Sequence, residues 1–329
     1  MADRKQQLIN GRYEILSDLG TGGMAQVFLA KDRRFRREVV VKMLHQQLLN
    51  SPEAREVREQ FRIEAALMLR LKHPNIVTIY EYGEYKGRPF MVLEPLTNNS
   101  LSRRMAEFGD HERAAKLLAT IADALGHMHK RRIVHCDVKP DNILFDEHDR
   151  PKLTDFGVAQ LLPNEYQNGH NDEPFTTPFL QGTPQYMSPE QWQNTLSPQS
   201  DQYALGVVLF ELLTREWPFS DTSALETGDA HLYQRVPRPT EIVKDLPEAV
   251  DTVVLRMLAK KPEQRYANMA ETAQALRELA KVPLSDGERK RRKAVDQHRN
   301  RKRWRWWLLA SIGILIVAAV AAVIIWQVL

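Results

Sequence analysis

Two short motifs in the middle of the chain place two carboxylates, an ammonium group and an amide close together in the sequence. The first motif is His135–Asn142, with the sequence HCDVKPDN, and the second is Asp155–Gly157, with the sequence DFG. Phosphoryl transfer needs an oxygen that accepts a hydroxyl proton, and it needs hard oxygen ligands for a divalent cation. Asp137 fits the first role, and Asn142 and Asp155 fit the second. The two motifs therefore indicate phosphoryl-transfer chemistry.

The order and spacing of these motifs resemble those of the protein kinases. Either motif alone could be an ordinary turn, because Asp and Asn are common turn residues. The resemblance implies ATP as the phosphate donor, Asp137 as the catalytic base and Lys139 as the cation that balances charge on the transferred phosphate. It also implies that Asn142 and Asp155 hold Mg²⁺, with Mn²⁺ as the alternative metal.

The resemblance covers about residues 12–280 and looks closest to the bacterial Hanks-type Ser/Thr kinases. It implies an α+β, two-lobed protein-kinase fold, with a small β-rich N-lobe over about residues 12–94 and a larger, mainly helical C-lobe over about residues 97–280. The stretch Lys139–Asn142 resembles the Ser/Thr-specific form of the catalytic loop. We therefore expect transfer to Ser or Thr hydroxyls of protein substrates, with autophosphorylation in the activation loop.

A glycine-rich stretch near the N terminus predicts a nucleotide-binding hairpin. It lies between two β-prone segments, Arg12–Leu16 and Val27–Ala30. Glycines let backbone N–H groups approach phosphates, because no Cβ is in the way. Ala25 stands where the resemblance leads us to expect a third glycine. The predicted phosphate-binding residues are Gly20, Thr21, Gly22 and Gly23.

A lysine and a glutamate upstream of the catalytic motifs are predicted to form an ion pair. The β-branched run Glu38–Leu44 carries Lys42, and a helix from Ser51, its expected N-cap, to about Arg70 carries Glu64. Alone, either charge could simply be solvated at the surface. By resemblance, Lys42 binds phosphate and Glu64 positions it.

The resemblance also places the adenine site between the lobes. Glu94, Pro95 and Leu96 correspond to the hinge, so the carbonyl of Glu94 and the N–H of Leu96 are expected to bind the adenine edge. Val40 stands where kinases commonly carry alanine, and its extra bulk narrows the slot. The expected apolar walls are Val27, Val40, Leu93 and Leu144.

Three further acids are predicted to organise the C-lobe. Asp110 is the expected N-cap of the helix that leads into the catalytic loop. Asp201 begins a helix that is apolar on every side, and its carboxylate is expected to hold the backbone of the catalytic loop. By resemblance, Glu190 pairs with Arg265 in a structural ion pair.

Cys136 departs from the kinase pattern, since regulated kinases usually carry an arginine there. The segment between Gly157 and Glu190 resembles an activation loop, in which Thr176 and Thr177 are candidate phosphorylation sites. A neutral cysteine cannot bind their phosphates, so we expect these sites to tune docking more than they switch catalysis. An alternative cation would be Arg58 or Arg62 of the helix that carries Glu64.

The thiol itself is expected to be unreactive, because the neighbouring Asp137 disfavours a thiolate. As the single cysteine of the chain, Cys136 cannot form an intrachain disulfide, which suits a reducing cytoplasm. The polar start of the chain indicates no secretory signal peptide.

The C-terminal tail differs from the rest in composition. The segment from Arg289 to Arg305 holds ten Lys or Arg against one Asp, a surplus greater than the net charge of +4 of the whole chain, so the remainder of the chain is net acidic. This local basicity argues against a general nucleic-acid-binding surface. Because residues 281–303 are polar and basic with few apolar positions, we predict a juxtamembrane linker there.

An uncharged apolar run from Leu308 to Leu329 follows three tryptophans. Helical residues rise about 1.5 Å each, so the run spans roughly 33 Å, enough to cross a hydrocarbon core of about 30 Å. The sequence therefore predicts a single transmembrane helix over residues 307–328. Lys and Arg flank only its N-terminal side, which places the kinase lobes in the cytoplasm of a single-pass cell-membrane protein. No extracellular sensor domain is expected beyond Leu329.

The expected partners are Ser/Thr-bearing protein substrates, membrane lipid, a cognate protein phosphatase and a second copy of the chain. The small residues Ala318 and Ala322 permit such a homodimer within the membrane. Nucleic acid is not expected. One alternative is a pseudokinase scaffold that binds nucleotide or partners without phosphoryl transfer, and another is a small-molecule kinase. The first is disfavoured by retention of the full ionic set, and the second by the protein-kinase-like docking segment that ends at Glu190.

Overall fold

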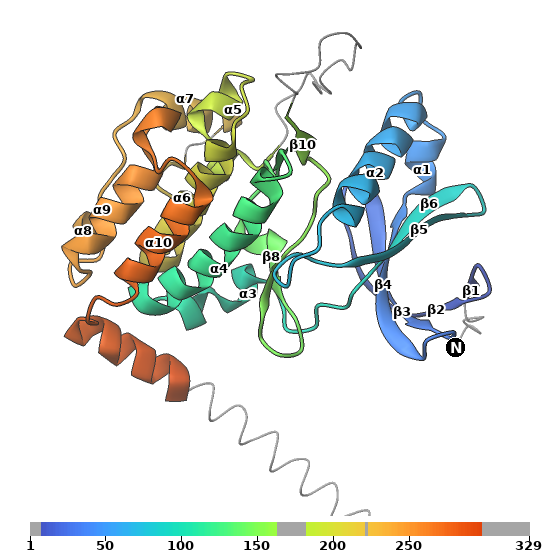
Figure 1. Cartoon of the computed structure of the whole chain (residues 1–329), viewed down its shortest axis with the longest axis horizontal. Helices are drawn as coiled ribbons and strands as arrows, with labels where there is room; N and C mark the ends of the chain where they lie inside the picture. The colour runs from blue at the N-terminus through green and yellow to red at the C-terminus, as the bar shows by residue number, and fades with distance from the viewer. Residues whose placement is uncertain (1–7, 163–181, 221–222, 298–329) are drawn as a thin grey trace, which may run out of the picture.

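The computed structural model describes residues 8–162, 182–220 and 223–297. It has two lobes: a twisted sheet with one long helix on it, and a larger helical lobe (Figure 1). Within these described ranges, no helix is long and apolar enough to cross a bilayer. The transmembrane helix predicted over residues 307–328 lies outside them, as do Thr176 and Thr177. The α+β, two-lobed architecture expected from the sequence is confirmed.

The N-lobe is built on a six-stranded antiparallel sheet with strand order β1-β2-β3-β4-β6-β5. Val39 and Val41 point into a small core on the outer side of the sheet, whereas Val40 and Lys42 alternate with them and face the other way. Two helices, α1 and α2, follow β4. The elements are β1 (Leu8–Ile9), β2 (Tyr13–Thr21), β3 (Ala25–Asp32), β4 (Arg37–Leu44), α1 (Gln46–Leu49), α2 (Ala54–Leu69), β5 (Ile79–Tyr85) and β6 (Arg88–Leu93).

The start of α2 differs from the sequence prediction. The helix begins at Ala54, its N-cap residue is Glu53, and no side chain caps it. The Ser51 hydroxyl instead donates to the carbonyl of Leu48 at 3.0 Å. The same carbonyl accepts the backbone N–H of Ser51 at 3.3 Å, so both donors of Ser51 serve the C-terminal end of α1 and its hydroxyl does not cap α2.

The C-lobe is centred on α6, whose residues from Ser200 to Thr214 are buried, as an all-round apolar helix should be. Asp110 caps α4 by accepting the N–H of Arg113 at 3.0 Å, as predicted. The C-lobe elements are α3 (Leu101–Arg104), η1 (Met105–Phe108), α4 (His111–His129), β7 (Ile133–Val134), η2 (Pro140–Asn142), β8 (Ile143–Phe145), β9 (Pro151–Leu153), β10 (Gln160–Leu161), η3 (Pro184–Tyr186), α5 (Pro189–Trp192), α6 (Pro198–Thr214), α7 (Ala224–Tyr233), α8 (Pro239–Ile242), α9 (Glu248–Met257), η4 (Pro262–Gln264) and α10 (Met269–Leu279).

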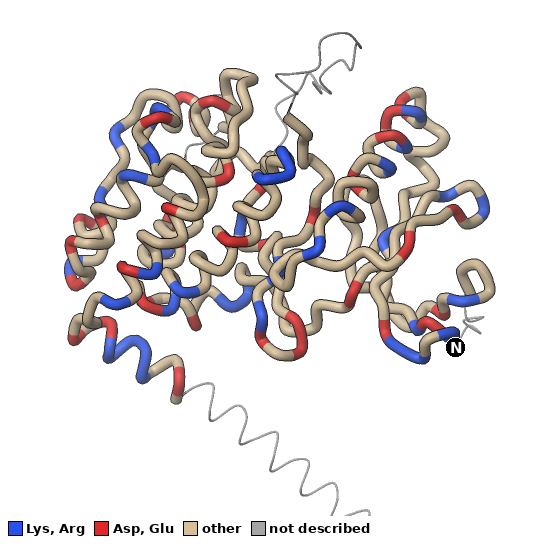
Figure 2. Tube along the Cα trace, in the orientation of Figure 1, with Lys and Arg blue, Asp and Glu red and all other residues tan. Residues whose placement is uncertain are grey.

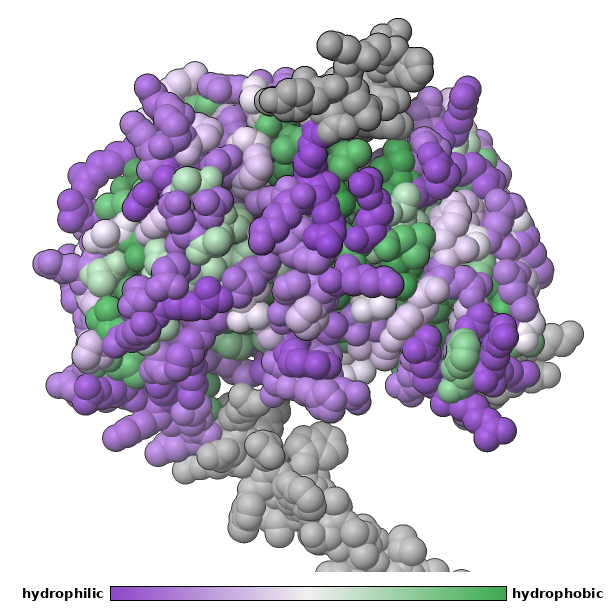
Figure 3. Space-filling view, viewed as in Figure 1, coloured by the Kyte–Doolittle hydropathy of each residue, from purple (hydrophilic) through white to green (hydrophobic). Residues whose placement is uncertain are grey.

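One hydrophobic core runs through both lobes. Phe61 and Met68 of α2, Leu93 of β6 and Leu125 of α4 belong to the same buried cluster, which also contains Phe156 of the DFG motif. Apolar surface is visible along the junction of the lobes in Figure 3. Because the two lobes share packing, α2 is held at a defined position relative to the catalytic loop.

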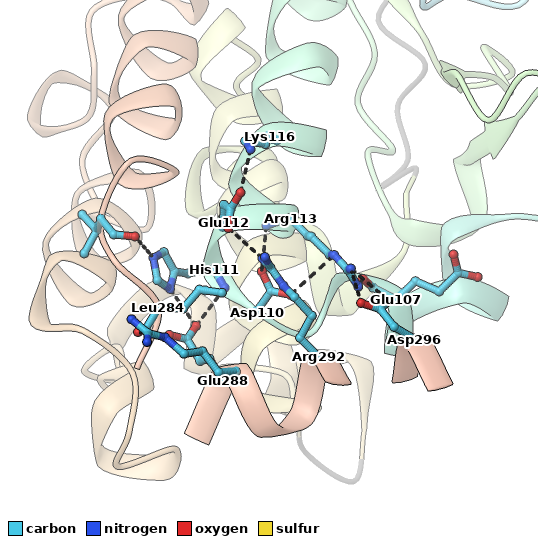
Figure 4. Close-up of polar contacts among 12 residues, drawn as sticks. Glu107, Asp110, His111, Glu112, Arg113, Lys116, Leu284, Glu288, Arg292 and Asp296 are labelled. Carbon is cyan, nitrogen blue, oxygen red and sulfur yellow. Dashed lines mark hydrogen bonds and ion pairs between the residues drawn. The ribbon is translucent and has the colours of Figure 1, made fainter. Parts of the chain in front are cut away.

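The structure corrects the linker prediction for residues 286–297. These residues are helical and lie against the base of the C-lobe (Figures 1 and 4). The contacts are mostly charged: Arg292 binds Asp110 and Glu112, and Arg113 binds Asp296 at 2.8 Å. A composition with few apolar residues therefore does not prevent docking here, because ion pairs make much of the interface.

A buried ion pair anchors this docked helix. Glu288 and His111 have no exposed surface, and Nδ1 of His111 lies 2.6 Å from Oε1 of Glu288. The other ring nitrogen of His111 faces the carbonyl of Val282 at 3.0 Å. Since both partners are acceptors, both nitrogens donate and the ring is an imidazolium. Burial alone would lower the pKa of His111, but the hydrogen bond from Glu288 outweighs burial and raises it.

We expect Glu288→Gln to release the helix over residues 286–297, because a buried imidazolium would lose its counter-charge. Removing one partner of a buried pair costs about 3 kcal/mol, or roughly a hundredfold in protection of these amides from hydrogen exchange. The raised pKa of His111 means that the stabilisation is complete below its unfolded pKa of about 6.5 and is lost as pH rises through the folded value. In the wild type, the protection of these amides, after correction for the intrinsic exchange rate at each pH, should therefore fall as pH rises through the folded pKa of His111.

Glu278→Gln on α10 is the matched control, since that side chain is exposed and pairs only with Lys281 at the surface. It should leave the exchange of residues 286–297 unchanged. Equal protection in Glu288→Gln and wild type would contradict the anchoring role of the buried pair.

Candidate active site

The ion pair predicted between Lys42 and Glu64 is present. Nζ of Lys42 on β4 lies 2.7 Å from Oε1 of Glu64 on α2 and 3.2 Å from Oδ1 of Asp155. Glu64 is buried, with 4% of its surface exposed. The lysine thus links the N-lobe sheet, α2 and the DFG motif.

Lys42 and Asp155 stabilise each other's charges, whereas burial raises the pKa of Glu64 above its usual value despite the neighbouring Lys42. Burial lowers the pKa of the Lys42 ammonium, but the carboxylates of Glu64 and Asp155 outweigh burial and hold it above its usual range. Partial burial would raise the pKa of Asp155, yet Lys42 outweighs it and the pKa is lowered. Lys42 is therefore a cation and Asp155 an anion at neutral pH.

The DFG motif is held from both lobes. Phe156 is buried and its ring lies 5.1 Å from the ring of His135, centroid to centroid. Nε2 of Gln60 on α2 donates to the carbonyl of Gly157 at 2.8 Å. Asp155 has a φ of +63°, in the left-handed region that costs a non-glycine residue about 1–3 kcal/mol. These contacts hold Asp155 in that conformation.

A single buried carboxylate positions the catalytic loop. Oδ2 and Oδ1 of Asp201 accept the backbone N–H groups of His135 and Cys136, both at 2.9 Å, and Nε2 of His129 lies 2.7 Å from Oδ2. Burial would raise the pKa of Asp201, but its hydrogen bonds, led by that of His129, lower it. The predicted role of Asp201 in holding the catalytic-loop backbone is confirmed. Within this loop Cys136 has a φ of +67°.

Asp137 lies at the centre of a polar network. Its Oδ1 accepts both the N–H and the hydroxyl of Thr183, at 3.0 and 2.9 Å. Its Oδ2 lies 2.7 Å from Nζ of Lys139 and 3.0 Å from Nδ2 of Asn142. The structure therefore brings together Asp137, Lys139 and Asn142, as the motif predicted.

Thr183 was not predicted as a site residue. Besides Asp137, its hydroxyl binds Nζ of Lys139 at 2.6 Å, so it bridges the acid and the cation. In the sequence it appears only as part of a Gly-Thr-Pro turn far from the catalytic loop. No local signal could have identified it, because its role comes from a contact between residues 46 positions apart.

Asn142 and Asp155 can each offer one kind of oxygen ligand to a divalent cation. Nδ2 of Asn142 is occupied by hydrogen bonds to the carbonyl and carboxylate of Asp137, so its Oδ1 is the atom that can bind metal. Asp155 is ionised and supplies carboxylate oxygen. Carboxylate and amide oxygens are typical ligands of hard cations, which take their remaining ligands from water and phosphate.

The glycine-rich hairpin forms as predicted between β2 and β3. Gly20–Gly23 are exposed at its end, and the N–H of Gly22 donates to the carbonyl of Ala25 at 2.9 Å, which closes the turn. Gly20 has a φ of +154°, a conformation that side chains rarely permit. The N–H of Gly20 donates to the carboxylate of Asp18 at 2.8 Å, so the N–H groups of Gly20 and Gly22 are both engaged within the hairpin.

The expected adenine walls share one face of the sheet. Val27 pairs with Lys42 across β3 and β4, and Val40 pairs with Leu93 across β4 and β6, so their side chains lie on the same side. Leu144 belongs to β8 of the C-lobe. All except Leu93 are partly exposed, as residues that line an open slot should be.

The hinge carries an ion pair between the lobes. The carboxylate of Glu94 accepts the N–H of Thr78 at 2.7 Å and lies 2.8 Å from Nζ of Lys152 on β9. The side chain of Glu94 is therefore occupied in joining the lobes. Its carbonyl and the N–H of Leu96 remain the predicted contacts to the adenine edge.

Cys136 is buried, and its Sγ lies 3.6 Å from the carbonyl of Val134. Burial, followed by the carboxylates of Asp201 and Asp137, raises the pKa of its thiol well above the usual range. An unreactive thiol was predicted, but the main cause is burial, with Asp201 ahead of the neighbouring Asp137.

The alternative cations on α2 are not directed at the catalytic loop. Arg58 donates to the carbonyl of Gly87 at 2.7 Å, and Arg62 pairs with Glu59 on its own helix. The α2 side chains that reach the DFG motif are the neutral Gln60 and the acidic Glu64, and neither is a cation. These positions give no support to either arginine as a substitute for the arginine missing at Cys136.

The predicted structural ion pair of the C-lobe is present. Arg265 is bidentate to Glu190, with N–O distances of 2.7 and 2.8 Å, and both residues are buried. Gln191, the next residue of α5, donates to the carbonyl of Cys136 at 3.0 Å. The segment that ends at α5 is thereby joined to the catalytic loop.

Comparison with known proteins gives a consistent result. Residues 13–278 match the family model described as the protein kinase domain. The chain is 33% identical to the serine/threonine-protein kinase PrkC of Bacillus subtilis, over 96% of this chain and 53% of that protein. It is 36% identical to PknB of Mycolicibacterium smegmatis and 35% identical to PknB of Mycobacterium tuberculosis, each over 80% of this chain and 42% of the relative. The chain thus spans about half the length of these curated relatives. Since the family model covers most of the sequence, the chain belongs to the protein kinase family.

Proposed function

We propose that this chain is an ATP-dependent serine/threonine protein kinase. The observation that carries the proposal is the pairing of two clusters across the cleft: Lys42 with Glu64 and Asp155, and Asp137 with Lys139 and Asn142. The PrkC and PknB relatives are named Ser/Thr kinases, which supports the same activity. A pseudokinase scaffold would have no chemical need for both clusters.

In the proposed reaction, a Ser or Thr hydroxyl of the protein substrate lies against Oδ1 of Asp137. The carboxylate orients this hydroxyl and accepts its proton as the oxygen bonds to the γ-phosphorus. Thr183 and Lys139 hold the carboxylate in place, with contacts of 2.9 and 2.7 Å. Lys139 also places a positive charge beside the transferred group. The glycine-rich hairpin and Lys42 bind the donor phosphates.

The residues Asn142 and Asp155 would hold Mg²⁺, or Mn²⁺ in its place. When bound, this cation neutralises phosphate charge and polarises the transferred group. The lowered pKa of Asp155 keeps its carboxylate ionised, and therefore able to bind metal, throughout the neutral range. Lys42 holds that carboxylate within reach of the cleft.

We also propose that the helix predicted over residues 307–328 anchors the kinase in the cell membrane, with the lobes in the cytoplasm. The support is the uncharged, apolar sequence of the run and the cluster of Lys and Arg on its N-terminal side. The same proposal includes two partners: a second copy of the chain, through the span, and a cognate phosphatase that removes the phosphate.

We expect Asp137→Asn to lower kcat by about 10²–10⁴-fold, because the acceptor hydroxyl loses its base. Binding of the nucleotide should change little, since Asp137 makes no expected contact with it. Asp155→Ala should lower both kcat and metal–nucleotide affinity. The measurements are phosphate transfer to a peptide and nucleotide binding by calorimetry, with the exposed Glu147→Gln as control. Wild-type turnover by Asp137→Asn would refute the proposed reaction.

Thr183→Val should lower kcat by about 10–100-fold, the cost of one hydrogen bond to a charged group, while the KM for ATP stays near its wild-type value. Thr183→Ser keeps the hydroxyl that bridges Asp137 and Lys139, so it should restore most of the rate. A purely structural role would instead predict equal losses in both variants, or a change in thermal stability that parallels the change in rate.

Deleting Arg303–Leu329 should release a soluble, active kinase, because none of the site residues lies in that segment. The measurement is membrane fractionation together with autophosphorylation. If the truncated chain sedimented with membranes as fully as the intact one, the proposed anchor would be wrong. Activity lost on truncation and regained by forced dimerisation would show that the span also pairs two kinases.

A further inference from the structure

The docked helix over residues 286–297 divides its cations between two faces. On the inner side, Arg291 is bidentate to Asp245 at 2.9 Å, and Arg292 binds Asp110, the N-cap of α4. Together with the buried pair of His111 and Glu288 (Figure 4), these contacts fix the rotation of the helix about its own axis. The direction in which its other side points is therefore defined relative to the C-lobe.

The outer side carries Arg289, Lys290 and Lys293, all exposed. Gln297 continues this side, because residues four positions apart lie on the same face of a helix. In the part of the chain that the structure describes, no ion pair engages Lys290 or Lys293, and the guanidinium of Arg289 donates to the carbonyl of Leu284 at 3.0 Å.

From Arg289 to Gln297 the one acid, Asp296, is paired with Arg113 of the C-lobe. Asp286, at the start of the helix, is exposed on the outer side, four positions before Lys290. The outer face therefore carries three cations against one carboxylate and is net positive.

The position of this face in the chain suggests its partner. In the sequence, the apolar run begins at Leu308, eleven residues beyond Gln297, and five more Lys or Arg residues lie between them. Eleven residues reach at most about 40 Å. If the run spans the membrane, as proposed above, the end of this face at Gln297 lies within that distance of the lipid surface and can reach it. A planar array of anionic headgroups would match a row of exposed cations.

The neighbouring surface limits the contact to the helix. Figure 2 shows the cations of this helix and the loop between β8 and β9 at the same lower edge of the molecule. In that loop Asp146 is buried against Arg150 and Asp149 pairs with Arg104, whereas the side chain of Glu147 is 79% exposed. An anionic surface would attract the helix and repel this loop, so the lobes would stand away from the lipid on the side of the loop.

We propose that the outer face of residues 286–297 binds anionic lipid headgroups, and that the ion pairs on its inner face thereby fix the orientation of the kinase domain at the membrane. The inference rests on the proposed membrane anchor. Each Lys or Arg near an anionic membrane surface strengthens binding about fivefold. Removing Lys290 and Lys293 should therefore weaken the contact by roughly 25-fold.

The test uses the full chain with Gln297→Cys, labelled with a fluorophore at that position. Cys136 should take no label, because it is buried and the pKa of its thiol is raised. The labelled chain is reconstituted into nanodiscs that contain a headgroup quencher in phosphatidylcholine, with or without phosphatidylglycerol. We expect stronger quenching with phosphatidylglycerol, and a return to the phosphatidylcholine level in the Lys290→Gln/Lys293→Gln variant.

The matched control is Lys86→Gln/Lys261→Gln, which removes two exposed lysines from other surfaces. It should quench as the wild type does. The proposal is overturned if quenching is the same in both lipid compositions, or if the Lys290→Gln/Lys293→Gln variant quenches as strongly as the control.

If the proposed membrane anchor does not exist, the experiment gives a different result. A chain without a transmembrane span would not remain with the nanodiscs after detergent removal, whatever their lipid. The same labelled chain is then mixed with preformed vesicles of the two compositions. Quenching that depends on phosphatidylglycerol and on the two lysines would still support the lipid-binding face, and its absence would refute it.

Discussion

The buried carboxylate of Asp201 is the constraint on which the rest of the site depends. It accepts hydrogen bonds from His129 at the end of α4 and from two backbone N–H groups of the catalytic loop, so one side chain joins α4, α6 and the loop. A charge with no exposed surface is stable only when hydrogen bonds surround it. The loop must therefore adopt this one conformation for the carboxylate to be satisfied, and Asp137 is positioned as a consequence.

Much of the fold and the site could be predicted because the decisive signals are local. The HCDVKPDN and DFG motifs, the N-cap at Asp110 and the apolar helix after Asp201 each lie within a few adjacent residues. Lys42 on β4 and Glu64 on α2 lie on elements separated only by the short helix α1, and they follow one another along the chain in the order that the kinase resemblance implies. Where a residue's role follows from its immediate neighbours, sequence reasoning identified it.

The missed features arise from contacts over long sequence separations. Thr183 contacts Asp137 only after the whole segment between them has folded back. The docked helix was mistaken for a linker because hydrophobic periodicity is the usual signal for packing, whereas this interface is made by arginines and carboxylates that fall on separate elements. Ser51 does not cap α2 for a related reason, because its hydroxyl donates to a carbonyl at the end of α1 instead. In each case a polar side chain has several possible hydrogen-bond or ion-pair partners, and amino-acid composition does not specify which one it binds.

Arg132, Cys136 and Asp155 all have positive φ values, between +63° and +67°, and none is a glycine. At about 1–3 kcal/mol each, the stretch from the end of α4 to the DFG motif stores conformational energy that only the surrounding contacts retain. These residues can return to ordinary backbone conformations when a few hydrogen bonds are lost, while the hydrophobic core stays packed. On heating, the catalytic geometry should thus relax while the two lobes remain folded, and the enzyme would inactivate at a temperature below its calorimetric transition.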